Sequence, residues 1–135
     1  MTRLRYLRRC RLVGLLGVLL TGATAFACIT QPAVPPLRLK QGLTVRELRG
    51  WVEDRDHARI GRACMVLYDS NGKQPVASLN ASGSGSFTFG KLPLGEYELV
   101  ISDSHGIFRP LALPVKIVNS PKVQPGDVRV WLDLG

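Results

Sequence analysis

Two histidines lie in the stretches of this sequence whose side chains could bind a metal ion. His57 follows the run Glu53-Asp54-Arg55-Asp56, and carboxylates beside an imidazole can coordinate a divalent cation. The spacing matches no known metal motif, and His105 lies in a separate polar turn at residues 103–106. We therefore predict solvated loops at both histidines, with no metal and no cofactor.

The candidate nucleophiles also lack a catalytic setting. Ser82, Ser84 and Ser86 alternate with glycine, whereas a hydrolase serine usually occupies a sharp strand-to-helix turn. Cys64 would need a basic partner nearby to become a nucleophilic thiolate. Its place in an alternating apolar segment is typical of a small buried hydrophobic residue. We predict no catalytic residue, and hence that the protein is not an enzyme.

The first 27 residues have the pattern of an export signal. Five arginines and no acidic residue lie within the first eleven positions, an apolar run follows, and Ala25-Phe26-Ala27 ends the segment. This order is typical of a secretory signal peptide. The strongly apolar part has about nine residues, fewer than the roughly 20 of a membrane-spanning helix. We predict a signal peptide over residues 1–27 and a periplasmic, membrane-anchored or secreted protein.

Cys28 directly follows this segment, and three fates are open to it. A cysteine after a small residue resembles the lipobox of bacterial lipoproteins, in which a lipid on the cysteine attaches the protein to a membrane. In an oxidising compartment Cys28 could instead pair with Cys64, or it could remain free. The lipobox favours a lipoprotein, in which Cys64 would be a lone thiol.

Removal of the signal changes what the net charge indicates. The chain has 18 Lys and Arg against 10 Asp and Glu, a formal charge of +8, which by itself would favour a nucleic acid or an anionic membrane as partner. Five arginines belong to residues 1–27, so 13 basic and 10 acidic residues remain. Because those charges are interspersed, we expect no nucleic-acid partner.

Apolar and polar residues alternate along most of the remaining chain, and no segment has a helical period. Turn-forming sequences such as Asn71-Gly72 separate these segments. Alternation of this kind predicts strands with one face in a core, and turns every 8–15 residues or so are typical of a sandwich. The pattern predicts a Pro-rich tether over residues 28–42 and an all-β, seven-stranded Greek-key sandwich over residues 43–135. The clearest alternating segments are 48–53, 63–68, 87–89, 97–101, 115–117 and 128–134.

One stretch is more specific than this general pattern. Residues 85–99 follow the skeleton G-x-F-x-F-x-x-L-P-x-G-x-Y-x-L, and residues 48–54 follow h-x-G-x-V-x-D. The two phenylalanines supply apolar area to a core, while the proline and the second glycine shape a turn. The pattern-forming residues are Gly50, Val52, Gly85, Phe87, Phe89, Leu92, Pro93, Gly95, Tyr97 and Leu99.

These motifs resemble the carboxypeptidase regulatory-like domain, a transthyretin-like (prealbumin-like) β-sandwich. Members of that family accompany enzymes, outer-membrane receptors and surface proteins as accessory or recognition units. The catalytic metal of zinc carboxypeptidases belongs to a different domain. The resemblance therefore implies a non-enzymatic binding or structural module. Together with the export signal of residues 1–27, it indicates a small exported bacterial protein that acts at the cell envelope.

Three aromatic residues offer the best candidate binding surface. Trp51, Tyr68 and Trp131 lie opposite the core-facing residues of their predicted strands. Outward aromatic rings can stack on sugars or anchor a protein partner, or they can pack across the outer face of a sheet. Besides the accessory role, we consider a carbohydrate-binding module that uses these aromatics, and a subunit of a secretion system or periplasmic assembly. The partner would be a protein or a glycan.

Overall fold

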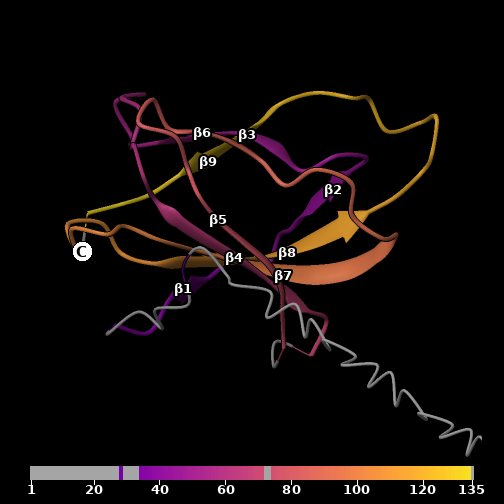
Figure 1. Cartoon of the computed structure of the whole chain (residues 1–135), viewed down its shortest axis with the longest axis horizontal. Coiled ribbons are helices and arrows are strands. Elements are labelled where there is room, and N and C mark those ends of the chain that lie inside the picture. Colours follow the sequence, from indigo (N-terminus) through magenta and orange to yellow (C-terminus); the bar gives the residue numbers. More distant parts are fainter. Residues whose placement is uncertain (1–27, 29–33, 72–73, 135) are drawn as a thin grey trace, which may run out of the picture.

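The computed structural model describes residues 28, 34–71 and 74–134, which form two packed β-sheets (Figure 1). The predicted signal peptide, residues 1–27, lies outside the described residues. Within the described part of the chain, every regular element is a strand, and no helix is long and apolar enough to cross a membrane. The all-β prediction is therefore confirmed.

The larger sheet, sheet A, has six strands in the order β1-β8-β7-β4-β5, and β2 also pairs with β8. Both β1 and β2 run parallel to β8, whereas the other neighbours are antiparallel. The strands are β1 (Leu37–Arg38), β2 (Leu43–Val45), β4 (Cys64–Asp69), β5 (Pro75–Asn80), β7 (Gly95–Ser102) and β8 (Leu111–Ile117).

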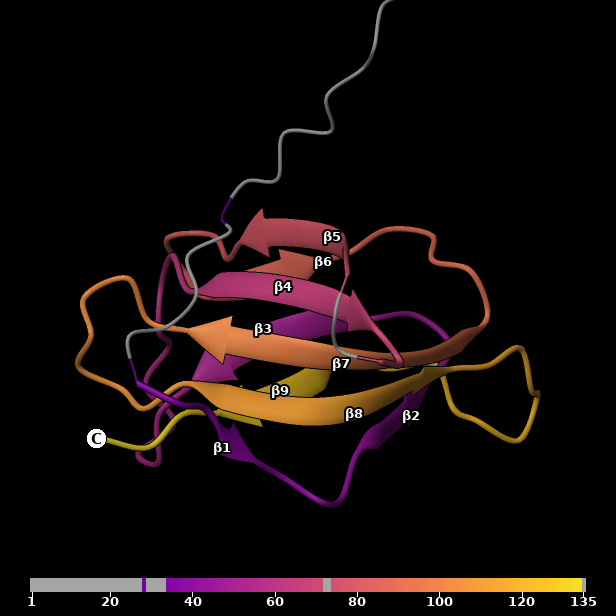
Figure 2. The same cartoon turned by 90° about the horizontal axis from the view of Figure 1, so that it is seen from below.

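The smaller sheet, sheet B, has the order β6-β3-β9. It consists of β3 (Arg49–Glu53), β6 (Ser86–Thr88) and β9 (Val128–Trp131). Strand β3 is antiparallel to β6 and parallel to β9. Figure 2 shows that the two sheets end on the same side, so that β9 of sheet B and β1 and β2 of sheet A border one side of the sandwich.

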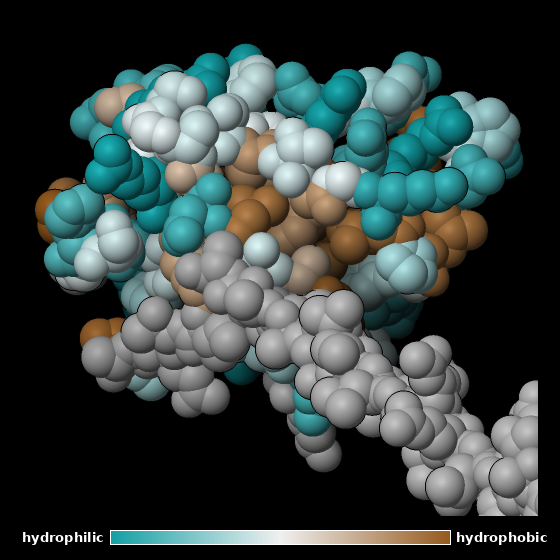
Figure 3. Space-filling view, in the orientation of Figure 1, coloured by the Kyte–Doolittle hydropathy of each residue, from teal (hydrophilic) through white to brown (hydrophobic). Residues whose placement is uncertain are grey.

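The core lies between the sheets and follows the alternation of the sequence. Strand β4 is buried along most of its length, and its Met65 and Leu67 are fully buried. Apolar surface is visible in the middle of the face seen in Figure 1, beneath a mostly hydrophilic upper part (Figure 3). The largest fully buried side chains are Leu48, Met65, Leu67, Leu99, Ile101, Leu132, Val52 and Val115.

The residues of the G-x-F-x-F motif build one part of this core. Phe87 is buried and Phe89 packs against the core, with their rings edge to face at a centroid distance of 6.2 Å. The Tyr97 hydroxyl donates a 2.6 Å hydrogen bond to the Pro93 carbonyl. Gly95 has a φ of 152°, a conformation that side chains disfavour. The motif therefore shapes the connection between β6 and β7, while Leu92 packs at the core's edge.

Sequence alternation located six of the nine strands that the structure describes and missed three short or exposed ones. β1 lies within the segment expected to be a tether, where Leu37 N–H donates to Pro110 O at 2.8 Å and Leu39 N–H to Ala112 O at 2.9 Å. Part of that segment thus belongs to the sheet. β5 was missed because it is an edge strand whose side chains stay partly exposed.

Candidate functional site

The fold brings Trp51 and Trp131 together on the outer face of sheet B. Strands β3 and β9 are parallel neighbours, with Trp51 opposite Arg129 and Glu53 opposite Trp131. Because side chains alternate along a strand, Gly50 and Val52 face the core while these residues face outward. We name the resulting group the sheet B cluster, which comprises Trp51, Glu53, His57, Arg59, Arg129 and Trp131.

A turn after β3 positions two members of this cluster. The Asp54 carboxylate accepts hydrogen bonds from the backbone N–H of Asp56 at 2.8 Å and of Ala58 at 2.9 Å. His57 adopts a φ of 63° within this turn, a left-handed conformation uncommon outside glycine. The chain thereby folds back over the end of β3, which places His57 and Arg59 above Glu53.

Glu53 is the centre of the cluster and is only 4% exposed. Its carboxylate accepts a hydrogen bond from Trp131 Nε1 at 3.2 Å and lies 3.3 Å from His57 Nδ1 and 3.7 Å from Arg59 Nε. A buried carboxylate is stable only when such donors replace water. The hydrogen bond from Nε1 to Glu53 therefore fixes the Trp131 ring at the edge that carries its nitrogen.

The same surroundings keep Glu53 ionised. Burial raises the pKa of this carboxyl, but hydrogen bonds from His57 and Trp131, the nearby Trp51 N–H and the Arg129 charge outweigh burial, so the pKa lies below its usual value. Trp51 Nε1 itself is buried and forms no hydrogen bond within the described structure. The dipole of this N–H group therefore acts on the Glu53 carboxylate without a hydrogen bond between them. Glu53 is thus a fixed negative charge beneath a cationic and aromatic surface.

Acid is expected to destabilise the protein through this group. A carboxyl whose pKa is lowered by folding contributes stability above its unfolded pKa and loses it as the pH falls through the folded pKa. Urea unfolding at a series of pH values should therefore show a stability that declines as the pH falls below about 5. Glu53→Gln should be less stable at pH 7 yet lose less stability on acidification. An unchanged slope in this variant would contradict the assignment.

The two tryptophans differ in what covers them. The Arg59 guanidinium lies 4.2 Å from the centroid of the Trp51 ring and that of Arg129 lies 5.4 Å away, distances suited to cation–π attraction. Trp51 is therefore packed on the sheet. Trp131 is 55% exposed, and its ring meets His57 edge to face at 5.8 Å. Trp131 is the member of the cluster that offers a large apolar surface to a partner.

Other predicted residues lie elsewhere. Tyr68 is on β4 of sheet A, so it does not share a surface with the two tryptophans of sheet B. The prediction that all three aromatic residues form one binding surface therefore fails for Tyr68. His105 lies in a turn whose backbone N–H groups at His105 and Ile107 donate to Asp103 at 3.2 and 3.0 Å. Among the described residues, no group of three or more His, Cys, Asp or Glu side chains could hold a metal ion.

The three serines of the Gly/Ser loop bond to one another. Ser82 Oγ lies 2.9 Å from Ser84 Oγ and 2.7 Å from Ser86 Oγ, and it accepts a bond from the Ser86 N–H at 3.1 Å. The hydroxyls thus close the turn before β6, as expected for loop residues.

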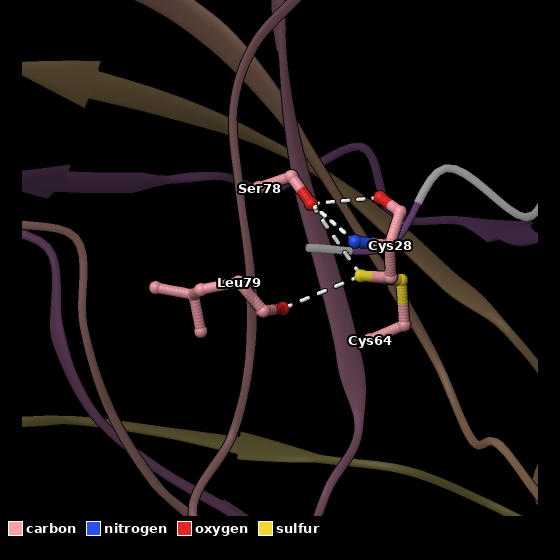
Figure 4. Close-up of a disulfide and its surroundings, with 4 residues drawn as sticks. All are labelled: Cys28, Cys64, Ser78 and Leu79. Atoms are coloured by element: carbon pink, nitrogen blue, oxygen red, sulfur yellow. Dashed lines mark hydrogen bonds between the residues drawn. A yellow bond between two sulfur atoms is a disulfide. The ribbon is translucent and has the colours of Figure 1, made fainter. Parts of the chain in front are cut away.

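Cys28 is bonded to Cys64 in a disulfide (Figure 4). The Ser78 hydroxyl of edge strand β5 accepts a hydrogen bond from Cys28 N–H at 3.0 Å and donates one to Cys28 O at 2.7 Å. This corrects the interpretation of Cys64 as a lone strand thiol. In this state Cys28 also has no free sulfur for a lipid thioether, because both bonds require the same atom.

Sequence reasoning missed Arg59 and the central place of Glu53. The available signal was a carboxylate at an outward position of a strand next to an outward Trp51. Its burial follows from the register of β3 with β9 and from the turn at residues 54–59, and neither is a local property of the sequence.

The fold and site thus define an all-β domain of two packed sheets that carries an ordered aromatic and charged cluster on its smaller sheet. No family model matches the chain, and no curated protein matches it.

Proposed function

We propose that this chain is an exported, non-enzymatic accessory module that binds a protein partner through the sheet B cluster. The observation that carries the proposal is Trp131, which is 55% exposed although Glu53 holds its indole nitrogen. A large side chain already fixed in orientation loses little conformational entropy on binding. Tryptophan and arginine are also the residues most enriched among those that dominate binding energy.

The disulfide supports an extracytoplasmic location. Structural disulfides form and persist in oxidising compartments and are rare in the cytosol. The Cys28–Cys64 bond agrees in this respect with the export pattern of residues 1–27. We propose a disulfide-bonded periplasmic or secreted protein, in place of a lipoprotein anchored through Cys28.

We also propose that β3 to β9 form the seven strands of a Greek-key sandwich of the carboxypeptidase regulatory-like kind, with β1 and β2 as additions at the edge of β8. Supporting this are the burial of Phe87 and Leu99 and the turn bond of Tyr97 to Pro93. These contacts account physically for the motif that carries the resemblance.

Photo-crosslinking tests the binding role. Trp131 is replaced by benzoyl-phenylalanine in cells that produce the protein natively, and Val76 receives the same replacement as a control. Val76 is 46% exposed and lies on β5 of the other sheet. We expect a discrete protein adduct from position 131 that position 76 does not form. Equal adducts from both positions, or none from either, would contradict the proposal.

A carbohydrate-binding module is the second candidate, because an exposed indole beside guanidinium donors also suits a sugar ring. In that case position 131 forms no protein adduct. A glycan array would then show binding by the unmodified protein that is lost in Trp131→Ala and weakened in Trp51→Ala. Glycan binding unaffected by both substitutions would exclude this use of the cluster.

A further inference from the structure

The outer edge of β9 has no strand partner in the described part of the chain. In the order β6-β3-β9, this strand has one neighbour. Leu132 N–H donates to Glu53 O at 2.9 Å, which shows that residues of even number in this segment point their backbone groups toward β3. The N–H and C=O of Arg129 and Trp131 therefore face away from β3.

One backbone contact supports this assignment. Asp133 is the next odd-numbered residue after Trp131. Its backbone C=O accepts a 2.8 Å hydrogen bond from Arg109 N–H on the side of the segment that faces away from β3. The edge of β9 is thus already extended by another part of the chain at residue 133 and becomes free at Trp131 and Arg129. Unpaired strand edges of this kind are templates for the addition of another strand.

An apolar groove of about 710 Å³ lies along this free edge. It separates β9 from the segment of β1 and β2 at the edge of sheet A, on the side of the sandwich where both sheets end (Figure 2). Leu37 and Leu39 remain 36% and 41% exposed in it. The apolar residues that line the groove are Leu37, Leu39, Leu43, Leu111, Leu113, Val130 and Trp131.

The groove carries an excess of positive charge. Its charged lining residues are Lys40, Arg55, Arg129 and Asp133. Arg55 pairs with Asp133, with Nη2 and Oδ2 3.0 Å apart. Lys40 and Arg129 form no ion pair with any residue that the structure describes. Two cations outside any ion pair therefore lie beside the apolar residues of the groove, although Arg129 also lies 5.4 Å from the Trp51 ring centroid and near Glu53.

We propose that this groove binds an extended peptide segment of a partner protein, in which acidic and apolar residues alternate. The segment adds a strand to β9 through the backbone of Arg129 and Trp131, which is recognition by β-augmentation. Since side chains alternate between faces, its apolar side chains contact Leu37 and its neighbours while its carboxylates meet Arg129 and Lys40. This inference rests on the proposed binding function and names the partner's chemistry.

A second copy of the chain fits the edge less well. Two copies joined at this edge would bring together two grooves that each hold Lys40 and Arg129 outside any ion pair. Like charges brought close together repel. This excess of positive charge favours an acidic segment over self-association.

The proposal is tested with the purified, oxidised protein and a fluorescein-labelled octapeptide of alternating valine and glutamate. Fluorescence anisotropy should show binding at least about tenfold tighter than for the matched valine–lysine peptide, as two charge contacts would give. Arg129→Glu leaves Lys40 opposite one carboxylate and should remove this preference, and its thermal unfolding serves as the control for folding. Absence of binding up to about 1 mM peptide, or equal binding of both peptides, would overturn the proposal.

Backbone methylation tests strand addition without altering the protein. In an extended strand the N–H groups of alternate residues point to opposite edges. N-methylation of either all valines or all glutamates should therefore abolish binding, while methylation of the other set is tolerated. Tolerance of both would overturn β-augmentation. A dimer in sedimentation experiments that the peptide dissociates would overturn the choice of a partner segment over a second copy of the chain. If photo-crosslinking gave a protein adduct from position 131 but neither peptide bound, this inference would be wrong while the proposed binding function would still be supported.

Discussion

Gly50→Ala is expected to destabilise the two-sheet domain strongly. A Cβ at this position would lie 1.7 Å from Val128 O and 2.6 Å from Val128 N and C. These are backbone atoms of β9, so no side-chain rotation can relieve the clash, and β3 would have to separate from β9. The φ of 155° adds strain for any residue with a side chain.

The expected loss is at least about 3 kcal/mol, from overpacking together with backbone strain, against a total stability of roughly 5–15 kcal/mol for a domain. Soluble yield and thermal unfolding followed by circular dichroism measure it. Two glycines at which an added Cβ would meet no heavy atom within 4 Å serve as controls: Gly106, with a φ of 70°, and Gly126. Gly106→Ala should lose about 1 kcal/mol and Gly126→Ala close to none. If Gly50→Ala lost no more than Gly106→Ala, the close approach of β9 would not limit stability.

Gly50 also illustrates how far the sequence could predict the fold. Its presence in the h-x-G-x-V-x-D pattern and the alternation around it correctly predicted a strand with Val52 facing the core. The reason for a glycine is the backbone of Val128, which is distant in sequence. Periodicity predicts which residues face the core, because the alternation of side chains between the two faces is a local property of a strand, but it carries no information about which strand lies alongside.

The candidate site shows the same limit. The outward positions of Trp51 and Trp131 follow from alternation and were predicted, whereas their proximity depends on the parallel register of β3 and β9. Tyr68 has the outward parity that was predicted, yet its strand belongs to the other sheet. The burial of Glu53 required both the register and the turn that places His57 above it.

Breaking the Cys28–Cys64 bond is expected to lower the free energy of unfolding by about 3–4 kcal/mol. The bond joins residues separated by 36 positions, and a cross-link of this span removes that much loop-closure entropy from the unfolded chain. For a domain of this size the melting temperature should fall by roughly 15 °C. The measurement compares the oxidised protein with the double variant Cys28→Ser, Cys64→Ala, in which alanine avoids an unsatisfied hydroxyl at the buried position 64.

Ser78→Ala separates the covalent bond from the contacts around it. This variant keeps the disulfide but removes both hydrogen bonds between Ser78 and the backbone of Cys28, so a loss of about 1 kcal/mol is expected. A double variant that loses no more stability than Ser78→Ala would show that the cross-link adds nothing to stability.

Alkylation of the protein before and after reduction measures whether Cys28 and Cys64 are bonded in cells. The disulfide requires that neither Cys28 nor Cys64 is labelled until a reductant is added. A lipid on Cys28 would instead leave Cys64 open to alkylation without reduction, once unfolding exposes this buried thiol.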